Sequence, residues 1–126
     1  MLQLAMSNRG RLVDSLQELD LTFMQAHALR LLAESEPMTM RELAGRLHCD
    51  ASNVTGIIDR LEARKLVERR STPGDRRVKA LALTPAGLRL RRQAQERMEE
   101  PPAPIRQLSL ADQRVLRDIF RRATPA

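Results

Sequence analysis

The sequence predicts a mostly α-helical protein with one small β-hairpin, and three observations in residues 39–83 lead to this prediction. Apolar residues recur at helical spacing in residues 40–47 and again in residues 51–64, with a short break between the two segments. Two further segments rich in apolar residues then flank a turn that contains Pro73 and Gly74. Helix, turn, helix and hairpin in this order form a winged helix-turn-helix.

The first of these helices has a clear start and one apolar face. Thr39 and Glu42 have the spacing of a capping box, in which each side chain bonds the other residue's free backbone N–H. The apolar face carries Met40, Leu43, Ala44 and Leu47. We therefore expect this helix to lie against the core.

The second helix should begin after Asp50, which can cap it. Its apolar face carries Val54, Ile57, Ile58 and Leu61, and its other face holds only small or polar residues: Ser52, Asn53, Thr55, Gly56, Asp59 and Arg60. A helix with one buried face and a small, hydrogen-bonding opposite face can enter the major groove of DNA.

The basic residues are concentrated in one part of the chain. The whole chain has a formal charge of +6, whereas residues 60–92 alone hold 11 basic and 3 acidic residues, a balance of +8. A solvated charged face is the commoner cause of such a run. Here it coincides with the helix-turn-helix and its hairpin, which favours a polyanionic partner.

Helices are also expected on both sides of this region. Gly10 disfavours the first part of residues 1–20, so we expect a short helix there. Thr84 and Pro85 have the pattern of a helix start, and a last helix follows Ser109. Two apolar stripes exceed what a small monomer can bury and predict a dimer interface: Leu12, Leu16 and Leu19 at one end, and Val115, Leu116, Ile119 and Phe120 at the other.

Composition excludes several other functions. A single cysteine, Cys49, cannot form an intramolecular disulfide, which fits a cytoplasmic protein, and we interpret it as a structural thiol. No segment is long and apolar enough for a membrane span. His27 and His48 with one cysteine do not have metal-site spacing. Because no catalytic constellation or phosphate-binding loop is recognisable, we expect no enzyme, no metal and no cofactor.

Five segments together resemble the MarR family of transcriptional regulators, in the family's order and spacing. They are LTFMQ (Leu21–Gln25), RELAGRL (Arg41–Leu47), NVTGIIDRLEARKLVERR (Asn53–Arg70), GDRR (Gly74–Arg77) and LTPAG (Leu83–Gly87). The resemblance implies a homodimeric DNA-binding regulator, most often a repressor, on a near-palindromic operator. It also allows a small aromatic effector between the dimerisation helices and the DNA-binding lobe.

The resemblance also assigns domains and two backbone features. Residues 1–20 would form a short N-terminal dimerisation helix, residues 21–83 the winged helix-turn-helix DNA-binding lobe, and residues 84–126 the C-terminal dimerisation helices. His48 and Lys65 stand where the family most often has glycine, so left-handed backbone is expected at both.

Candidate DNA contacts follow from the helix face and the hairpin. In the recognition helix, about residues 51–64, Ser52, Asn53, Thr55 and Gly56 are expected at base edges or phosphates. Asp59 is expected to pair with a neighbouring arginine, and Arg60 is either that partner or a phosphate contact. Around the wing, residues 70–78, Arg69, Arg70 and Lys79 are expected at phosphates. At the tip, Arg76 and Arg77 are expected near the minor groove, with Asp75 orienting Arg77.

A second hypothesis comes from another class of protein. A winged helix can also serve as a protein-interaction module, whose basic wing would meet an acidic protein surface. Asn53, Thr55 and Arg77 together favour DNA, since they combine base-edge hydrogen bonding with a minor-groove cation.

Overall fold

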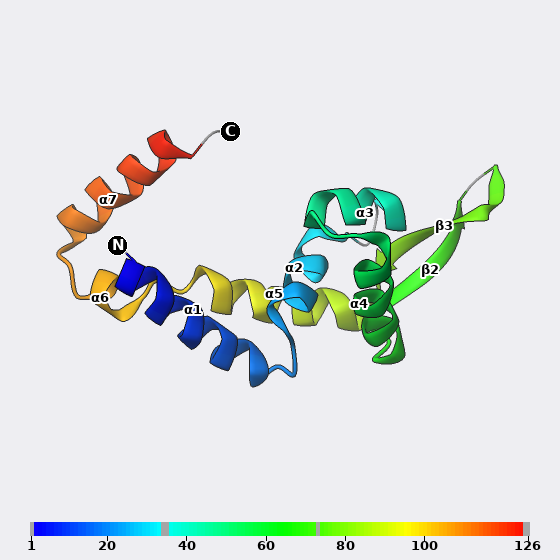
Figure 1. Cartoon of the computed structure of the whole chain (residues 1–126). Helices are drawn as coiled ribbons and strands as arrows, with labels where there is room; N and C mark the ends of the chain where they lie inside the picture. The colour runs from blue at the N-terminus through cyan, green and yellow to red at the C-terminus, as the bar shows by residue number, and fades with distance from the viewer. Residues whose placement is uncertain (1, 34–35, 73, 125–126) are drawn as a thin grey trace.

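The computed structural model describes residues 2–33, 36–72 and 74–124. Its elements follow one another as α1 Leu2–Gln17, α2 Phe23–Leu31, β1 Met38–Thr39, α3 Met40–Leu47, α4 Ala51–Ala63, β2 Val67–Thr72, β3 Asp75–Leu83, α5 Pro85–Glu99, α6 Ala103–Arg106 and α7 Leu110–Ala123. Figure 1 shows a lobe of α2–α4 with the β2–β3 hairpin, from which α5 leads away toward α6 and α7. The predicted winged helix-turn-helix with flanking helices is confirmed.

Side-chain caps begin the helices of the lobe, among them the predicted pair of Thr39 and Glu42. Thr39 accepts a hydrogen bond from the backbone N–H of Glu42 at 3.1 Å, and the Glu42 carboxylate accepts one from Thr39 N–H in return. Thr22 and Gln25 form the same reciprocal pair at the start of α2. These bonds satisfy amides that a helix start otherwise leaves without a partner.

The hairpin belongs to a three-stranded antiparallel sheet in the order β1-β3-β2. β2 and β3 pair with Val67 opposite Leu83 and Ser71 opposite Lys79, and the register shifts between Ser71 and Thr72. The very short strand β1 adds a third member, with Met38 opposite Leu81. Through β1 the sheet is joined directly to the start of α3.

One apolar core holds the lobe together. The residues that are fully or almost fully buried come from every element of the lobe and include Leu29, Leu43, Val54, Ile58, Leu61, Val67, Leu81 and Leu83. His48 and Lys65 have φ values of 53° and 58°, as predicted, and Asp20 has φ 55°. These left-handed residues turn the chain sharply after α1, α3 and α4.

Helix α5 begins in very close contact with the turn between α4 and β2. A Cβ atom built on Gly87 would lie 1.9 Å from the carbonyl oxygen of Leu66, so only glycine fits there. The Thr84 hydroxyl donates to the Lys65 carbonyl at 2.7 Å, and Thr84 N–H donates to the Leu66 carbonyl at 3.1 Å. The TPAG segment therefore fixes α5 to the base of the wing.

Helix α1 corrects two expectations from the sequence. It continues through Gly10 and spans 16 residues, so it is not short. The expectation that Leu16 lies in a dimer interface is wrong, because its side chain is 0% exposed within the chain's own core. Leu12 and Leu19 are partly buried and pack against the same core. Most of the predicted N-terminal stripe is thus used inside the monomer.

The apolar face of helix α7 is exposed, in contrast to that of α1. It follows α6 at the end of the molecule that lies opposite the wing (Figure 1). Val115, Ile119 and Phe120 are 57%, 46% and 53% exposed, and Leu116 is half-buried. Together with α1 and α6, α7 borders a groove of about 730 Å³ whose lining includes Leu4, Pro101, Pro102, Ile105, Leu116 and Phe120. The predicted C-terminal apolar stripe is therefore present and uncovered.

Within the described ranges, none of the helices combines the length and the apolar character that crossing a lipid bilayer requires.

Candidate nucleic-acid interface

The candidate interface is built on α4, which is fixed at its start by Asp50. The Asp50 carboxylate accepts hydrogen bonds from Asn53 N–H and from the Ser52 hydroxyl, both at 3.0 Å. These bonds stabilise the charged form, the Asn53 amide more than the Ser52 hydroxyl, and lower the pKa of Asp50. On the inner side, Val54 and Ile58 are completely buried.

The outer face of α4 carries the residues predicted from the sequence, and all of them are exposed: Ser52, Asn53, Thr55, Gly56, Asp59 and Arg60. Thr55 Oγ1 donates to the Ala51 carbonyl at 2.8 Å, which leaves its oxygen able to accept a bond from outside. A Cβ on Gly56 would meet nothing within 4 Å. Around Thr55 and Gly56 the face therefore carries only small side chains, and another molecule can approach the helix backbone closely.

The strand β2 is joined to α4 by an ion-pair cluster that the sequence did not predict. Arg69 lies 2.7 Å from an Asp59 oxygen and 3.5 Å from a Glu62 oxygen, both on α4. Asp59 was expected to pair with a neighbouring arginine such as Arg60, and the structure gives Arg69 as its partner. This cluster sets the wing against the helix and partly neutralises Arg69.

The other wing residues lie where a hairpin places them. Arg70 pairs with Glu68 on the same strand, and the Lys79 ammonium donates to the Ser71 hydroxyl at 3.0 Å across the hairpin. Arg77 is exposed on β3. Asp75 and Arg76 belong to β3 by their backbone, and their side chains lie outside what the structure describes, so the prediction for the Asp75–Arg77 pair stays a prediction.

Helix α4 is also tied to the end of α1, a contact between residues 44 positions apart that no local pattern signals. The Arg64 guanidinium donates to the Asp20 carbonyl at 2.6 Å and to the Leu19 carbonyl at 3.3 Å. These carbonyls follow the C-terminal turn of α1, where helical carbonyls lack amide partners. The orientation of the outer α4 face is therefore linked to α1.

The structure gives no metal centre in the part of the chain that it describes. Cys49 is half-buried, and its thiol donates to the Leu47 carbonyl at 3.4 Å. His27 stacks on Phe23, with ring centroids 6.2 Å apart. Partial burial lowers the pKa of His27, and the nearby charges of Arg30 and His48 lower it further.

These features define a winged-helix protein with an exposed polar helix face beside a basic hairpin. In a sequence comparison, the MarR family model matches residues 21–79. The curated relatives include the uncharacterized HTH-type transcriptional regulator YsmB of Bacillus subtilis, 38% identical over 82 residues, which are 65% of this chain and 55% of the relative. Another is the HTH-type transcriptional repressor NicR of Pseudomonas putida, 37% identical over 70 residues, 56% of this chain and 44% of the relative.

Solved structures show the same fold over nearly the whole chain. A MepR mutant of S. aureus bound to an oligodeoxyribonucleotide matches with a TM-score of 0.73 and 23% identity, covering 96% of this chain and 90% of that one. The chain spans about half the length of the curated relatives it matches. In sequence, the match to the MarR family covers residues 21–79, the lobe with most of its β2–β3 hairpin.

Proposed function

We propose that this protein is a DNA-binding transcription regulator that acts as a homodimer on a near-palindromic operator, most simply as a cytoplasmic repressor. The recognition helix, residues 51–64, consists of α4 and Arg64 and would lie in the major groove. The wing of residues 70–78 would lie at the minor groove. The observation that carries the proposal is the outer face of α4, which is polar and exposed while Val54 and Ile58 behind it are completely buried.

The chemistry of that face suits base and phosphate contacts. Asn53 is exposed, and its side chain has no bond to the rest of the described chain, so its amide can read an adenine edge. Arg60 lies about two helical turns after Asn53. It is exposed and also has no partner in the described ranges, so it suits a phosphate. Arg77 on the wing would supply the minor-groove cation.

The second copy of the chain is the partner proposed for the groove at α1, α6 and α7. Val115, Ile119 and Phe120 expose apolar surface on one face of α7, next to a groove that is itself mainly apolar. Exposed apolar surface of this extent is typical of an interface. A dimer would place two α4 helices side by side, as a near-palindromic operator requires.

Two comparisons support DNA over the alternative of an acidic protein partner. The structural neighbour MepR was solved bound to an oligodeoxyribonucleotide, and the relative NicR is named a transcriptional repressor. A small aromatic effector remains part of the proposal. It would lie between α1 and the lobe, where a cavity of about 510 Å³ is lined by residues that include Gln17, Thr22, Gln25, Arg60 and Arg64.

The test begins with a duplex that the parent chain selects from a random pool. Fluorescence anisotropy at several salt concentrations then compares Asn53→Ala and Arg77→Ala with the control Arg9→Ala, which removes an exposed charge on α1. Asn53→Ala should cost about 1–3 kcal/mol on the selected duplex and little on a scrambled one. Arg77→Ala should lose more on duplexes with A·T-rich flanks than on those with G·C-rich flanks.

Two results would contradict this function. If the parent selects no duplex, the protein is not a sequence-specific DNA binder. If Arg77→Ala binds every duplex as well as the parent does, the wing does not read DNA and the protein-interaction hypothesis gains. Binding to an acidic polymer of similar charge, measured beside duplex DNA, separates the two hypotheses.

A further inference from the structure

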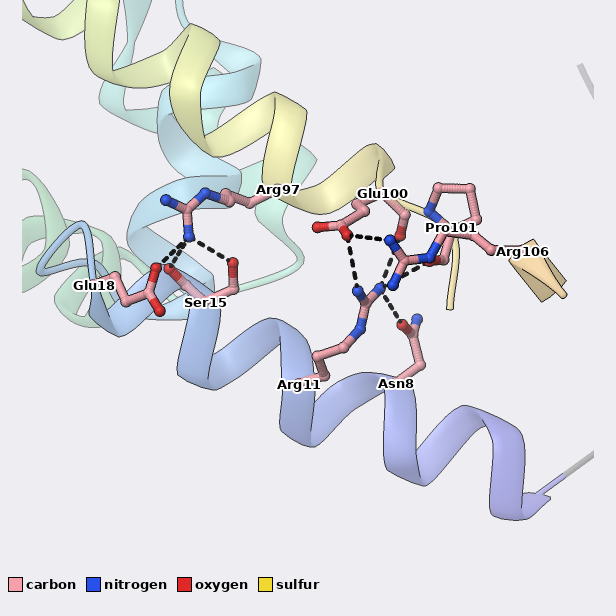
Figure 2. Close-up of polar contacts among 8 residues, drawn as sticks. All are labelled: Asn8, Arg11, Ser15, Glu18, Arg97, Glu100, Pro101 and Arg106. Carbon is pink, nitrogen blue, oxygen red and sulfur yellow. Dashed lines mark hydrogen bonds and ion pairs between the residues drawn. The ribbon is translucent and has the colours of Figure 1, made fainter. Parts of the chain in front are cut away.

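Arg11 on α1 reaches across to the point where α5 ends and α6 begins (Figure 2). One terminal nitrogen donates to the Glu100 carbonyl at 3.0 Å, to the Pro101 carbonyl at 3.2 Å and to Asn8 Oδ1 at 3.4 Å. The other terminal nitrogen lies 3.4 Å from the Glu100 carboxylate. A single guanidinium thus contacts both the backbone and a side chain at this junction.

The junction needs such a donor because of its sequence. Pro101 and Pro102 have no N–H and cannot continue α5, so the last carbonyls of that helix are without amide partners. A cation is favoured at a helix C-terminus by the helix dipole, and the planar guanidinium can bond several acceptors at once. Arg11 therefore fits the chemistry of this helix end.

The same junction is linked onward to α6. The Glu100 carboxylate oxygen that faces Arg11 also lies 3.1 Å from the Arg106 guanidinium on α6. In Figure 2, dashed lines join the Glu100 carboxylate to both arginines. The direction in which the chain leaves α5 is therefore set by a network that begins on α1.

Helix α1 is itself held at its other end, so it can act as a rigid support. Arg97 on α5 donates to the Ser15 hydroxyl at 3.0 Å and pairs with the Glu18 carboxylate (Figure 2). The Arg11 side chain is only 35% exposed, and its Nε atom is buried without a partner in the described chain. Packing thus confines the stem of Arg11 while its terminal nitrogens make all the bonds.

We propose that Arg11 is a positioning residue for the dimer: it sets the angle at which α6 and α7 leave α5, and through that angle the spacing of the two α4 helices. Asn8 and Pro101, which Arg11 contacts, also line the groove assigned to the second copy. The inference rests on the proposed homodimer and adds to it the residue that fixes its geometry.

The experiment uses full-length variants and measures operator spacing. Arg11→Met keeps the length of the stem and removes every donor, Arg11→Lys keeps the charge without the planar fork, and Arg9→Ala is the matched control on the same helix. Each protein is assayed by sedimentation for dimerisation. Anisotropy is then measured on a single half-site and on duplexes in which the two selected half-sites are moved apart or together in single base-pair steps.

The parent should prefer one spacing sharply, because its two α4 helices are held at a fixed distance. Arg11→Met should lower the preference for the best spacing over its neighbours about tenfold, since a loosely oriented second lobe loses effective concentration at that one geometry. Binding to the single half-site should be unchanged. Arg11→Lys should fall between, and Arg9→Ala should match the parent.

The outcomes separate the inference from the function on which it rests. If the parent is a dimer with a sharp spacing preference and Arg11→Met keeps that preference, the positioning role is wrong and the homodimer stands. If the parent is a monomer or binds no duplex, the proposed function fails, and the inference falls with it. Should Arg11→Met fold poorly by circular dichroism, Arg11→Lys decides by the same spacing profile: an unchanged preference overturns the positioning role, and a broadened one supports it.

Discussion

Helices α4 and α7 are almost equal in length, at 13 and 14 residues, and each carries one apolar face. In α4 that face meets α3 and the sheet, and Val54, Ile58 and Leu61 are 0% exposed. In α7 the corresponding face is open, with Ile119 46% exposed. The difference shows that helical periodicity identifies an apolar face but does not say whether the same chain covers it.

Helix α1 lies between these two cases. Its inner residue Leu16 is part of the lobe's core, whereas Leu4 near its start lines the groove beside α7. Helix α1 therefore contributes to the buried core near its C-terminal end and to the exposed groove near its start. This explains why the C-terminal stripe predicted from the sequence is exposed, whereas Leu16 of the N-terminal stripe is buried in the chain's own core.

The largest effect on stability is expected when the same substitution, isoleucine to alanine, is made in α4 and in α7. Ile58→Ala leaves a cavity in the closed core and should lower the free energy of unfolding by about 2–5 kcal/mol. Ile119→Ala removes a similar side chain from the open face. It should leave the unfolding of the lobe nearly unchanged and raise the dissociation constant of the dimer. Chemical denaturation and sedimentation measure the two quantities, and a monomer with strongly reduced stability in Ile119→Ala would contradict the comparison.

A smaller loss of stability is expected at the contact between α5 and the wing base. In Gly87→Ala the added methyl group would overlap the Leu66 carbonyl, so α5 must shift. The free energy of unfolding should fall by about 1–3 kcal/mol. Gly45→Ala on α3 is the control, because a Cβ there meets nothing within 4 Å. In a helix it should stabilise by up to about 1 kcal/mol. Equal thermal shifts for both variants would show that the Gly87 contact is not tight.

Local patterns in the sequence were sufficient for most of the fold of the lobe. The Thr39–Glu42 capping box, the Asp50 cap and the left-handed residues His48 and Lys65 all depend on neighbours within a few positions, and the structure has each of them. The polar face of α4 is equally local, because it is the complement of the apolar stripe. The candidate site was therefore predictable in its residue types and its exposure.

The remaining features depend on contacts between distant parts of the chain. Arg64 meets Asp20, and Arg11 meets Glu100, across separations that carry no periodic signal. The pairing of Arg69 with Asp59 depends on the angle at which β2 meets α4, and the sequence does not give this angle. These long polar side chains can reach several acceptors, so residue type alone does not select the partner.

Within the closed lobe, two arginines should differ in their contribution to DNA binding. Arg60 has no partner in the described chain, so Arg60→Ala should reduce the slope of log affinity against log salt by about 0.9. Arg69 already shares its charge with Asp59 and Glu62, so Arg69→Ala should reduce the slope by clearly less. Anisotropy titrations on one duplex at several salt concentrations give both slopes. Equal reductions would mean that the ion pairs open when DNA binds.

The smallest effect concerns the start of α4 and its dependence on pH. Asp50 has an ordinary pKa of 3.8 that is lowered in the fold, so folding favours its carboxylate. Its stabilisation of the helix start is therefore complete above the ordinary pKa and is lost as the pH falls through the lowered folded-state value. The protection of the Asn53 amide against hydrogen exchange should decrease in acid, measured from neutral pH down to about pH 3.

The start of α5 supplies the comparison for this pH effect. The Gly87 amide bonds the Thr84 hydroxyl at 3.0 Å, and a hydroxyl does not titrate in this range, so its protection should fall only with global unfolding. Asp50→Asn keeps an acceptor that caps helices well and removes the titration. In that variant the Asn53 and Gly87 amides should respond to acid alike. If Asn53 protection still falls selectively in Asp50→Asn, a group other than Asp50 controls the start of α4.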